Sequence, residues 1–109
     1  MSLFLNIHPG EILREEYLEP LALSAYRLAK DIGVSQTRIS DILHEKRGVS
    51  ADTALRFGKY FDTTPDFWLN LQNQFELRKA THDAGEAIAA IPRFQKPVAT
   101  LSRRAGSES

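Results

Sequence analysis

The chain has 109 residues, of which 42% are hydrophobic and 26% are charged, and it contains no cysteine. These values fit one globular domain and exclude a disulfide framework, a cysteine nucleophile and a cysteine-based metal site. No apolar run approaches the roughly 18 residues of a membrane span, and the first residues lack the pattern of a signal peptide, so we expect a cytoplasmic protein.

Charge is unevenly distributed, although 14 basic and 14 acidic side chains give a formal net charge of zero. Residues 1–23 hold one arginine and four glutamates, whereas residues 24–61 hold seven basic and four acidic side chains. From residue 62 onward the two signs balance. A basic segment inside a neutral molecule favours a polyanionic partner such as nucleic acid at that segment.

The first predicted helix covers residues 9–18. Pro9 suits a first helical position because proline lacks an N–H group, and Glu11 in the first turn complements the helix dipole. Pro20 is expected to end this helix. The preceding residues 3–7 (LFLNI) are strand-like.

Two short amphipathic helices are predicted next, and each begins at a serine. Ser24 is placed to cap the first, which Gly33 ends. Its apolar stripe consists of Ala25, Leu28, Ala29 and Ile32. Ser35 is placed to cap the second, which Gly48 closes. The inward residues of the second are Ile39, Ile42 and Leu43, with Val34 and Ile39 as a hydrophobic staple.

Two further helices complete the prediction. The fourth begins at Ser50, and its inward face holds Ala54, Phe57, Gly58 and Phe61. The fifth begins at Thr64 with Pro65 in its first position, and it is expected to run to about His82, since Gly85 is the next breaker. Residues 87–94 (AIAAIPRF) have weak strand character, restricted by Pro92 to a sheet edge or a bulge.

The pair of helices from Ser24 to about Glu45 carries the functional signal. Two short helices joined by a three-residue turn are typical of a helix-turn-helix, whose second helix enters the DNA major groove. Its outward side chains can hydrogen-bond base edges. The candidate base contacts are Gln36, Thr37, Arg38, Ser40 and Asp41.

Four more residues are candidates for contacts with phosphate. Ser24 and Ser35 lie at helix N-termini, where free N–H groups suit anions, and Lys46 and Arg47 lie in the loop after the recognition helix. The simpler interpretation is that the serines are N-caps worth about 1 kcal/mol each. Outward polar side chains are also common to every small helical protein.

Several motifs together resemble the HigA-type antitoxins (VapI/HigA, XRE-like) of host-inhibition toxin–antitoxin modules. They are HPGEIL (8–13), EEYLEPL (15–21), LAKDIGVSQTRIS (28–40), SADTALR (50–56) and TPDFWLNLQ (64–72). The resemblance spans roughly residues 7–80. It implies an all-α, five-helix repressor-like domain, a homodimer on operator DNA and a RelE-like ribonuclease toxin as partner. Relatives often place Gln or Arg at the start of helix two, where this chain has Ala25 and Tyr26, so base contacts from that helix stay open.

The fifth predicted helix carries an apolar side of Trp68, Leu71 and Phe75. Trp68 is interpreted as a core residue, with an anchor at a dimer or toxin interface as the alternative. Asn70 and Gln72 are candidates for bonds to the backbone that would lock this helix. The strand-like termini and the fifth helix together predict a homodimer.

The domain assignment follows from these patterns. Residues 1–95 form a helix-turn-helix domain for DNA binding and dimerisation, with short strand-like segments at both ends, and residues 96–109 form a mobile tail. Two alternatives stay open, namely a free-standing regulator without a toxin and a protein-interaction module without DNA binding. We expect no enzyme, metal or cofactor, because His8, His44 and His82 lie far apart and no catalytic motif is present.

Overall fold

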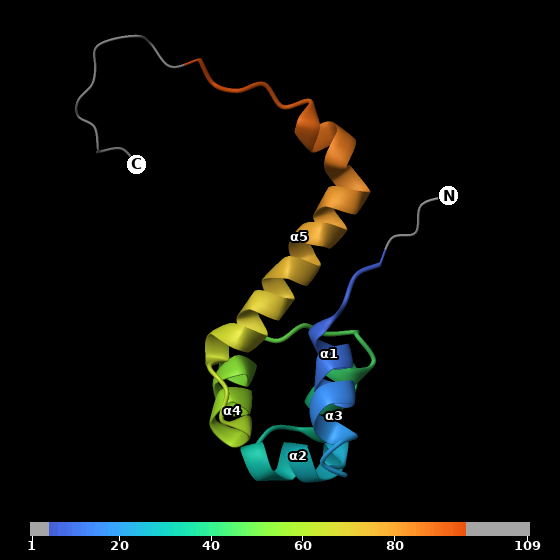
Figure 1. Cartoon of the computed structure of the whole chain (residues 1–109), viewed down its shortest axis with the longest axis vertical. Helices are drawn as coiled ribbons and strands as arrows, with labels where there is room; N and C mark the ends of the chain where they lie inside the picture. The colour runs from blue at the N-terminus through green and yellow to red at the C-terminus, as the bar shows by residue number, and fades with distance from the viewer. Residues whose placement is uncertain (1–4, 96–109) are drawn as a thin grey trace, which may run out of the picture.

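The structure, a computed structural model, describes residues 5–95 as a succession of helices. In chain order they are α1 (Pro9–Ile12), η1 (Leu13–Leu18), α2 (Ala25–Ile32), α3 (Gln36–Leu43), α4 (Ala51–Phe61) and α5 (Pro65–Ala89). Because η1 continues α1 directly, these are the five predicted helices. Figure 1 shows α1 to α4 gathered into one body, from which the second half of α5 projects.

The first helix changes its winding along its length. Its N-cap is His8, whose Nδ1 accepts the N–H of Gly10 at 2.9 Å. This cap was not predicted from the sequence. From Leu13 it is wound as a π-helix, and the N–H of Glu19 donates to the carbonyl of Arg14 five residues back, at 2.9 Å. The predicted boundaries are confirmed, and the π winding was not predicted.

The two helices of the predicted helix-turn-helix form as the sequence indicates. The hydroxyls of Ser24 and Ser35 accept the N–H groups of Arg27 and Arg38, each at 3.0 Å. Gly33 ends α2 with a φ of 76°, a left-handed conformation that glycine adopts without a steric penalty. The second helix ends at Leu43, two residues before the predicted end of the helix pair at about Glu45, and the loop with Lys46 and Arg47 follows it as expected.

The fifth helix is longer than predicted. It continues past His82 and through Gly85 to Ala89, with non-helical angles confined to Ala84. One glycine costs about 1 kcal/mol relative to alanine, too little to end a helix whose neighbours favour it. Proline is the stronger stop, and α5 ends shortly before Pro92 because the residue before a proline avoids helical angles.

Within residues 5–95, the segments predicted to be strand-like do not form strands. Residues 87–89 belong to α5, and neither residues 90–94 nor 5–7 pair as strands within the described chain. The rest of the N-terminal segment and the predicted mobile tail, 96–109, lie outside the described residues. An apolar sequence of five to eight residues favours a strand only when a partner strand is available.

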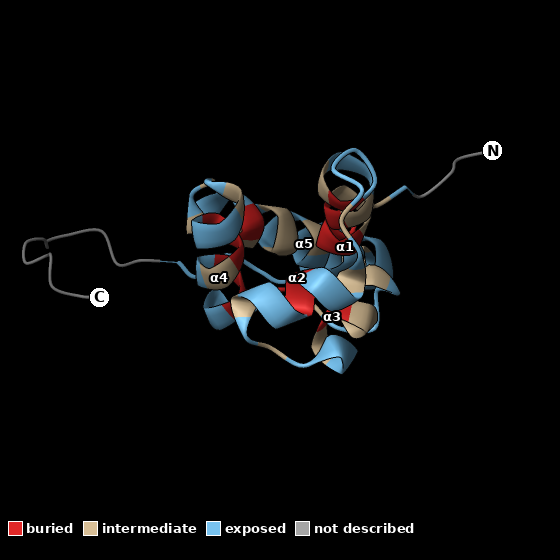
Figure 2. Ribbon diagram, turned by 90° about the horizontal axis from the view of Figure 1, so that it is seen from below, coloured by how far each residue is buried: buried red, intermediate tan, exposed pale blue. Residues whose placement is uncertain are grey.

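Trp68 is the centre of the hydrophobic core. Its side chain is fully buried, and its ring lies 4.9 Å from that of Phe57 and 5.2 Å from that of Tyr17. Its Nε1 donates to the Thr63 hydroxyl at 2.9 Å, so its polar atom is satisfied. Figure 2 shows the buried residues on the sides of the helices that face one another. Trp68 is therefore a core residue and not a surface anchor.

Candidate nucleic-acid interface

The N-terminal turn of α3 offers polar side chains to solvent. Gln36 and Thr37 are exposed, and within the described residues neither side chain has a hydrogen-bond partner. On the opposite side Ile39 and Ile42 are fully buried, which fixes the rotation of the helix. The two free side chains thus project from the helix end that a helix-turn-helix directs into the major groove.

Arg38 is held by the neighbouring helix α4. Its Nη1 donates to Oδ2 of Asp52 at 2.7 Å and to the Thr53 hydroxyl at 3.3 Å, and its side chain is 30% exposed. Unlike Gln36 and Thr37, Arg38 therefore has side-chain partners within the chain. The two bonds leave its Nε and Nη2 groups without partners in residues 5–95.

Asp52 also binds a second arginine. Arg56 donates from Nε to the same carboxylate oxygen at 2.9 Å, and its Nη1 donates to the carbonyl of Ile32 at 2.7 Å. The hydrogen bonds from Arg38 and then from Arg56 hold the pKa of Asp52 below its ordinary value. The carboxylate therefore stays ionised at neutral pH. It joins α4 to α3 through Arg38, and to the end of α2 through Arg56.

The remaining candidate base contacts lie further along α3. Ser40 and Asp41 are half-buried, and His44 Nδ1 lies 2.8 Å from the Ser40 carbonyl oxygen. Asp41 pairs with Nη2 of Arg47 at 3.4 Å. The first turn is thus the more accessible part of the helix, and base contacts by Ser40 and Asp41 stay a prediction.

The loop after α3 presents two cations. Lys46 and Arg47 are exposed, and the Lys46 N–H donates to the Asp41 carbonyl at 2.8 Å. Gln72 of α5 accepts the N–H of Val49 through Oε1 at 2.8 Å, which fastens the far end of the loop to the core. This bond confirms the predicted backbone contact of Gln72, whereas the side chain of Asn70 is exposed.

The helix starts have the geometry that a phosphate contact would use. Ser24 and Ser35 are exposed, and each already serves as an N-cap. Their capping role is therefore observed, and phosphate contacts stay a prediction. At the start of α2, Ala25 is half-buried and Tyr26 is 59% exposed. The side chain exposed there is therefore a tyrosine, where relatives of this fold often have glutamine or arginine.

The cluster that Asp52 forms with Arg38 and Arg56 was not predicted from the sequence. The i,i+4 spacing of Asp52 and Arg56 was a usable signal. The pairing of Arg38 with Asp52 spans 14 residues and depends on how α3 packs beside α4, so no local pattern predicts it.

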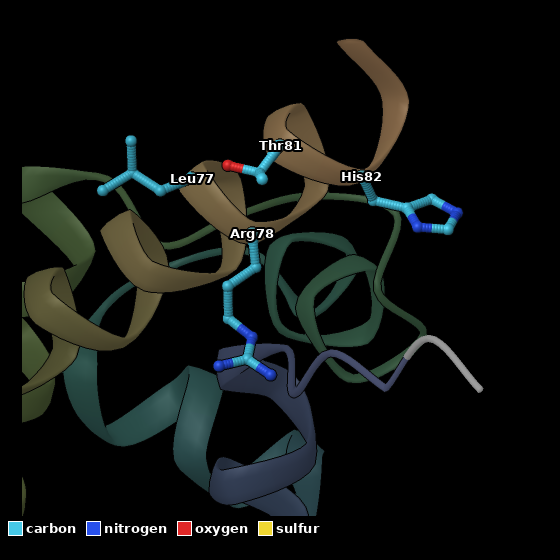
Figure 3. A pocket seen from close by; sticks show the side chains of 4 residues that line it. All are labelled: Leu77, Arg78, Thr81 and His82. Carbon is cyan, nitrogen blue, oxygen red and sulfur yellow. The ribbon is translucent and has the colours of Figure 1, made fainter. Parts of the chain in front are cut away.

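The projecting helix α5 carries the other predicted anchors. Leu71 and Phe75 are half-buried and line a hollow with Leu5 and Ile7, and Asn6 Nδ2 donates to the Phe75 carbonyl at 2.8 Å. Further along α5 lies a shallow pocket of about 410 Å³, and Figure 3 shows the side chains that line it. Its lining residues are Leu77, Arg78, Thr81 and His82.

Residues 5–95 lack two features of other protein classes, a metal site and a membrane span. No group of three histidine, aspartate or glutamate side chains is placed to hold a metal ion in this part of the chain. None of the described helices combines the length and the apolar character of a membrane span.

Comparison with known proteins places this geometry in a family. A helix-turn-helix family model matches residues 15–68. Virulence-associated protein I of Dichelobacter nodosus is 51% identical over 86 residues, which cover 79% of this chain and 80% of that protein. Antitoxin HigA of Pseudomonas aeruginosa superimposes with a TM-score of 0.80 at 43% identity, covering 84% of this chain and 100% of that one. The chain belongs to the HigA antitoxin family.

Solved structures that are similar to this chain include complexes with DNA. The Pseudomonas aeruginosa HigA structure contains the higBA promoter. Antitoxin GraA was determined in complex with its operator; it is 46% identical, with a TM-score of 0.79, and the match covers 88% of this chain and 98% of that one.

Proposed function

We propose that this HigA-family chain is a sequence-specific DNA-binding antitoxin that represses its own toxin–antitoxin operon. We also propose that it neutralises a RelE-like ribonuclease toxin by direct binding. The observation that carries the DNA-binding part is the exposed pair Gln36 and Thr37 in the first turn of α3, with the capped start of α2 before it in the chain and the basic loop after it. Family members determined with a promoter or an operator support the same assignment.

In this proposal the first turn of α3 enters the major groove. The Gln36 amide can form a bidentate pair with adenine, and Thr37 can contact a thymine methyl group or a base edge. Arg38 can clamp a guanine with the edge that Asp52 leaves free. The N–H groups at the starts of α2 and α3 are placed for phosphates, and Lys46 and Arg47 add charge beside them.

The test of sequence reading is Gln36→Ala, with Asn73→Ala on the exposed side of α5 as the control. Loss of a bidentate base contact should weaken operator binding by about 1 to 3 kcal/mol, while binding to random DNA changes much less. Gel shifts on both duplexes and thermal unfolding of each variant measure this. Gln36→Ala with unchanged affinity and unchanged discrimination would place the readout elsewhere.

A homodimer is part of the proposal. Large apolar side chains remain exposed on the N-terminal segment, on the projecting half of α5 and just beyond it. They are Leu5, Ile7, Leu77, Ile88, Ile91 and Phe94. Large exposed apolar side chains of this kind are typical of association sites. A second copy would also set two recognition helices about 34 Å apart, one turn of DNA.

The oligomeric state can be tested with two matched leucines. Leu77 on α5 is 67% exposed and Leu55 on α4 is 60% exposed, so each accepts a lysine without disturbing the core. Leu77→Lys should yield a monomer in sedimentation and weaken operator binding, because one half-site then binds alone. Leu55→Lys should remain a dimer. A parent chain that sediments as a monomer at micromolar concentration would contradict the proposal.

The toxin is tested genetically. A short neighbouring reading frame that codes a basic protein should arrest growth when it is expressed alone, and this chain should restore growth. The purified pair should elute together. Operator binding without any such neighbour would favour a free-standing regulator, whereas no specific and salt-sensitive DNA binding would favour a protein-interaction module.

A further inference from the structure

The contact between Arg38 and Asp52 joins the recognition helix to the helix that follows it. We propose that Asp52 is a positioning residue that determines operator specificity by fixing the guanidinium of Arg38 in the orientation that reads a base. This inference rests on the proposed DNA-binding function. It adds a residue of α4 that is not itself a base contact.

The geometry fixes one side of the guanidinium and leaves the other free. Nη1 of Arg38 donates to Oδ2 of Asp52 at 2.7 Å and to the hydroxyl of Thr53 at 3.3 Å. Thr53 is only 2% exposed, and its hydroxyl also accepts from Ser50 at 3.3 Å, so this acceptor cannot move freely. The Nε–Nη2 edge has no partner in residues 5–95, and this edge has the spacing of a bidentate contact.

Asp52 is itself held in place. Arg56 donates to the same carboxylate oxygen at 2.9 Å, and it is tied in turn to the carbonyl of Ile32 at 2.7 Å. Rotation of Asp52 away from Arg38 would therefore break a second bond. Its pKa lies below the ordinary value because of hydrogen bonds from Arg38 and Arg56.

The charge of Asp52 has a second effect. A carboxylate beside Arg38 weakens the attraction of that arginine for phosphate, which is the interaction that dominates binding to random DNA. A bidentate contact with a base depends on orientation and is favoured by the same carboxylate. Asp52 should therefore raise discrimination by strengthening specific binding and by weakening non-specific binding.

The experiment compares Asp52→Asn with Asp62→Asn. Asp62 lies at the opposite end of α4, is exposed and has a φ of 59°, which asparagine tolerates, so the control makes the same charge change. Binding to operator and to random duplex is measured over a salt series. For Asp52→Asn we expect discrimination to fall by about tenfold, with tighter binding to random DNA. Asp62→Asn should match the parent.

A double-mutant cycle separates positioning from a purely structural role. In the background of Arg38→Ala, Asp52→Asn should cause no further loss of discrimination, because the side chain that it orients is gone. Thermal unfolding is measured for every variant, since Asp52 also lies in the first turn of α4. An equal loss in both backgrounds would refute the inference.

The outcomes distinguish this inference from the function on which it rests. A parent chain that binds operator and random DNA equally would refute specific DNA binding, and the inference with it. A parent that discriminates, together with an Asp52→Asn variant that discriminates equally well, would refute the inference alone.

Discussion

Gln72→Ala should show how firmly the basic loop is fastened to the core. The Gln72 side chain accepts the N–H of Val49 at 2.8 Å, and Val49 is only 4% exposed, so water cannot easily replace the lost acceptor. A buried donor left without a partner costs about 1 to 3 kcal/mol. The bond from Gln72 to Glu76 at 2.8 Å is exposed and adds little.

Helix propensity offsets part of the loss, because alanine favours a helix over glutamine by a few tenths of a kcal/mol. We therefore expect a net loss of about 1 to 2 kcal/mol, which lowers the melting temperature by about 4 to 16 °C. Operator affinity should fall as well, because the loop carries Lys46 and Arg47.

The control is Asn70→Ala on the same helix, whose side chain is exposed and which should be neutral or slightly stabilising. Both variants are unfolded in urea at one fixed protein concentration, since an associating protein gains stability with concentration. A Gln72→Ala protein within about 0.5 kcal/mol of Asn70→Ala, roughly the range of a neutral surface change, would refute this account of the loop.

Three other perturbations test separate parts of the structure. Burial lowers the pKa of His8 below its ordinary value of 6.5, so the unfolded chain binds more protons and stability should fall as pH drops below about 6.5. Urea unfolding at pH 7.5 and 5.5 should show a smaller pH dependence for His8→Asn, which keeps an N-cap; an unchanged difference would exclude His8 as its source. Gly10→Ala should lose at least about 2 kcal/mol, because a Cβ there would overlap the carbonyl oxygen of Ile42, and backbone cannot move aside as a flexible side chain can. Gly85→Ala, whose added Cβ would meet Thr81 Cγ2 at a relaxed 4.0 Å, should instead gain about 0.5 to 1 kcal/mol, and equal melting temperatures for the two would contradict the close approach of α1 to α3. Lys46→Ala should weaken binding to operator and to random DNA alike and lower the salt slope by about one; parallel slopes would exclude a phosphate contact.

The helix starts could be predicted because their determinants are local. A serine or threonine followed by an amphipathic repeat sets the cap within three residues, and Ser24, Ser35, Ser50 and Thr64 all cap as expected. The inward faces follow from the same periodicity. The exposed first turn of α3 was therefore available from the sequence alone.

The features that could not be predicted depend on tertiary contacts or on competition between weak local signals. The position of Arg38 is set by Asp52 on another helix, and the cap of the first helix is a histidine, an uncommon residue in that role. The predicted end of α5 near His82 is wrong because Gly85 is a weaker helix stop than Pro92. The segments predicted as strands have no partner strand within residues 5–95.

The projecting half of α5 has a consequence for the lifetime of the protein. From Leu77 to Ala89 almost every residue is exposed, so this part of the helix receives little support from the core of its own chain. Isolated helices of this length are marginal in water. In a single chain these amide hydrogens should therefore exchange rapidly with solvent, and the segment should be open to proteolysis. If a second copy covers this segment, dilution separates the two copies and exposes the segment to proteolysis. The rate at which the protein is degraded then depends on its own concentration.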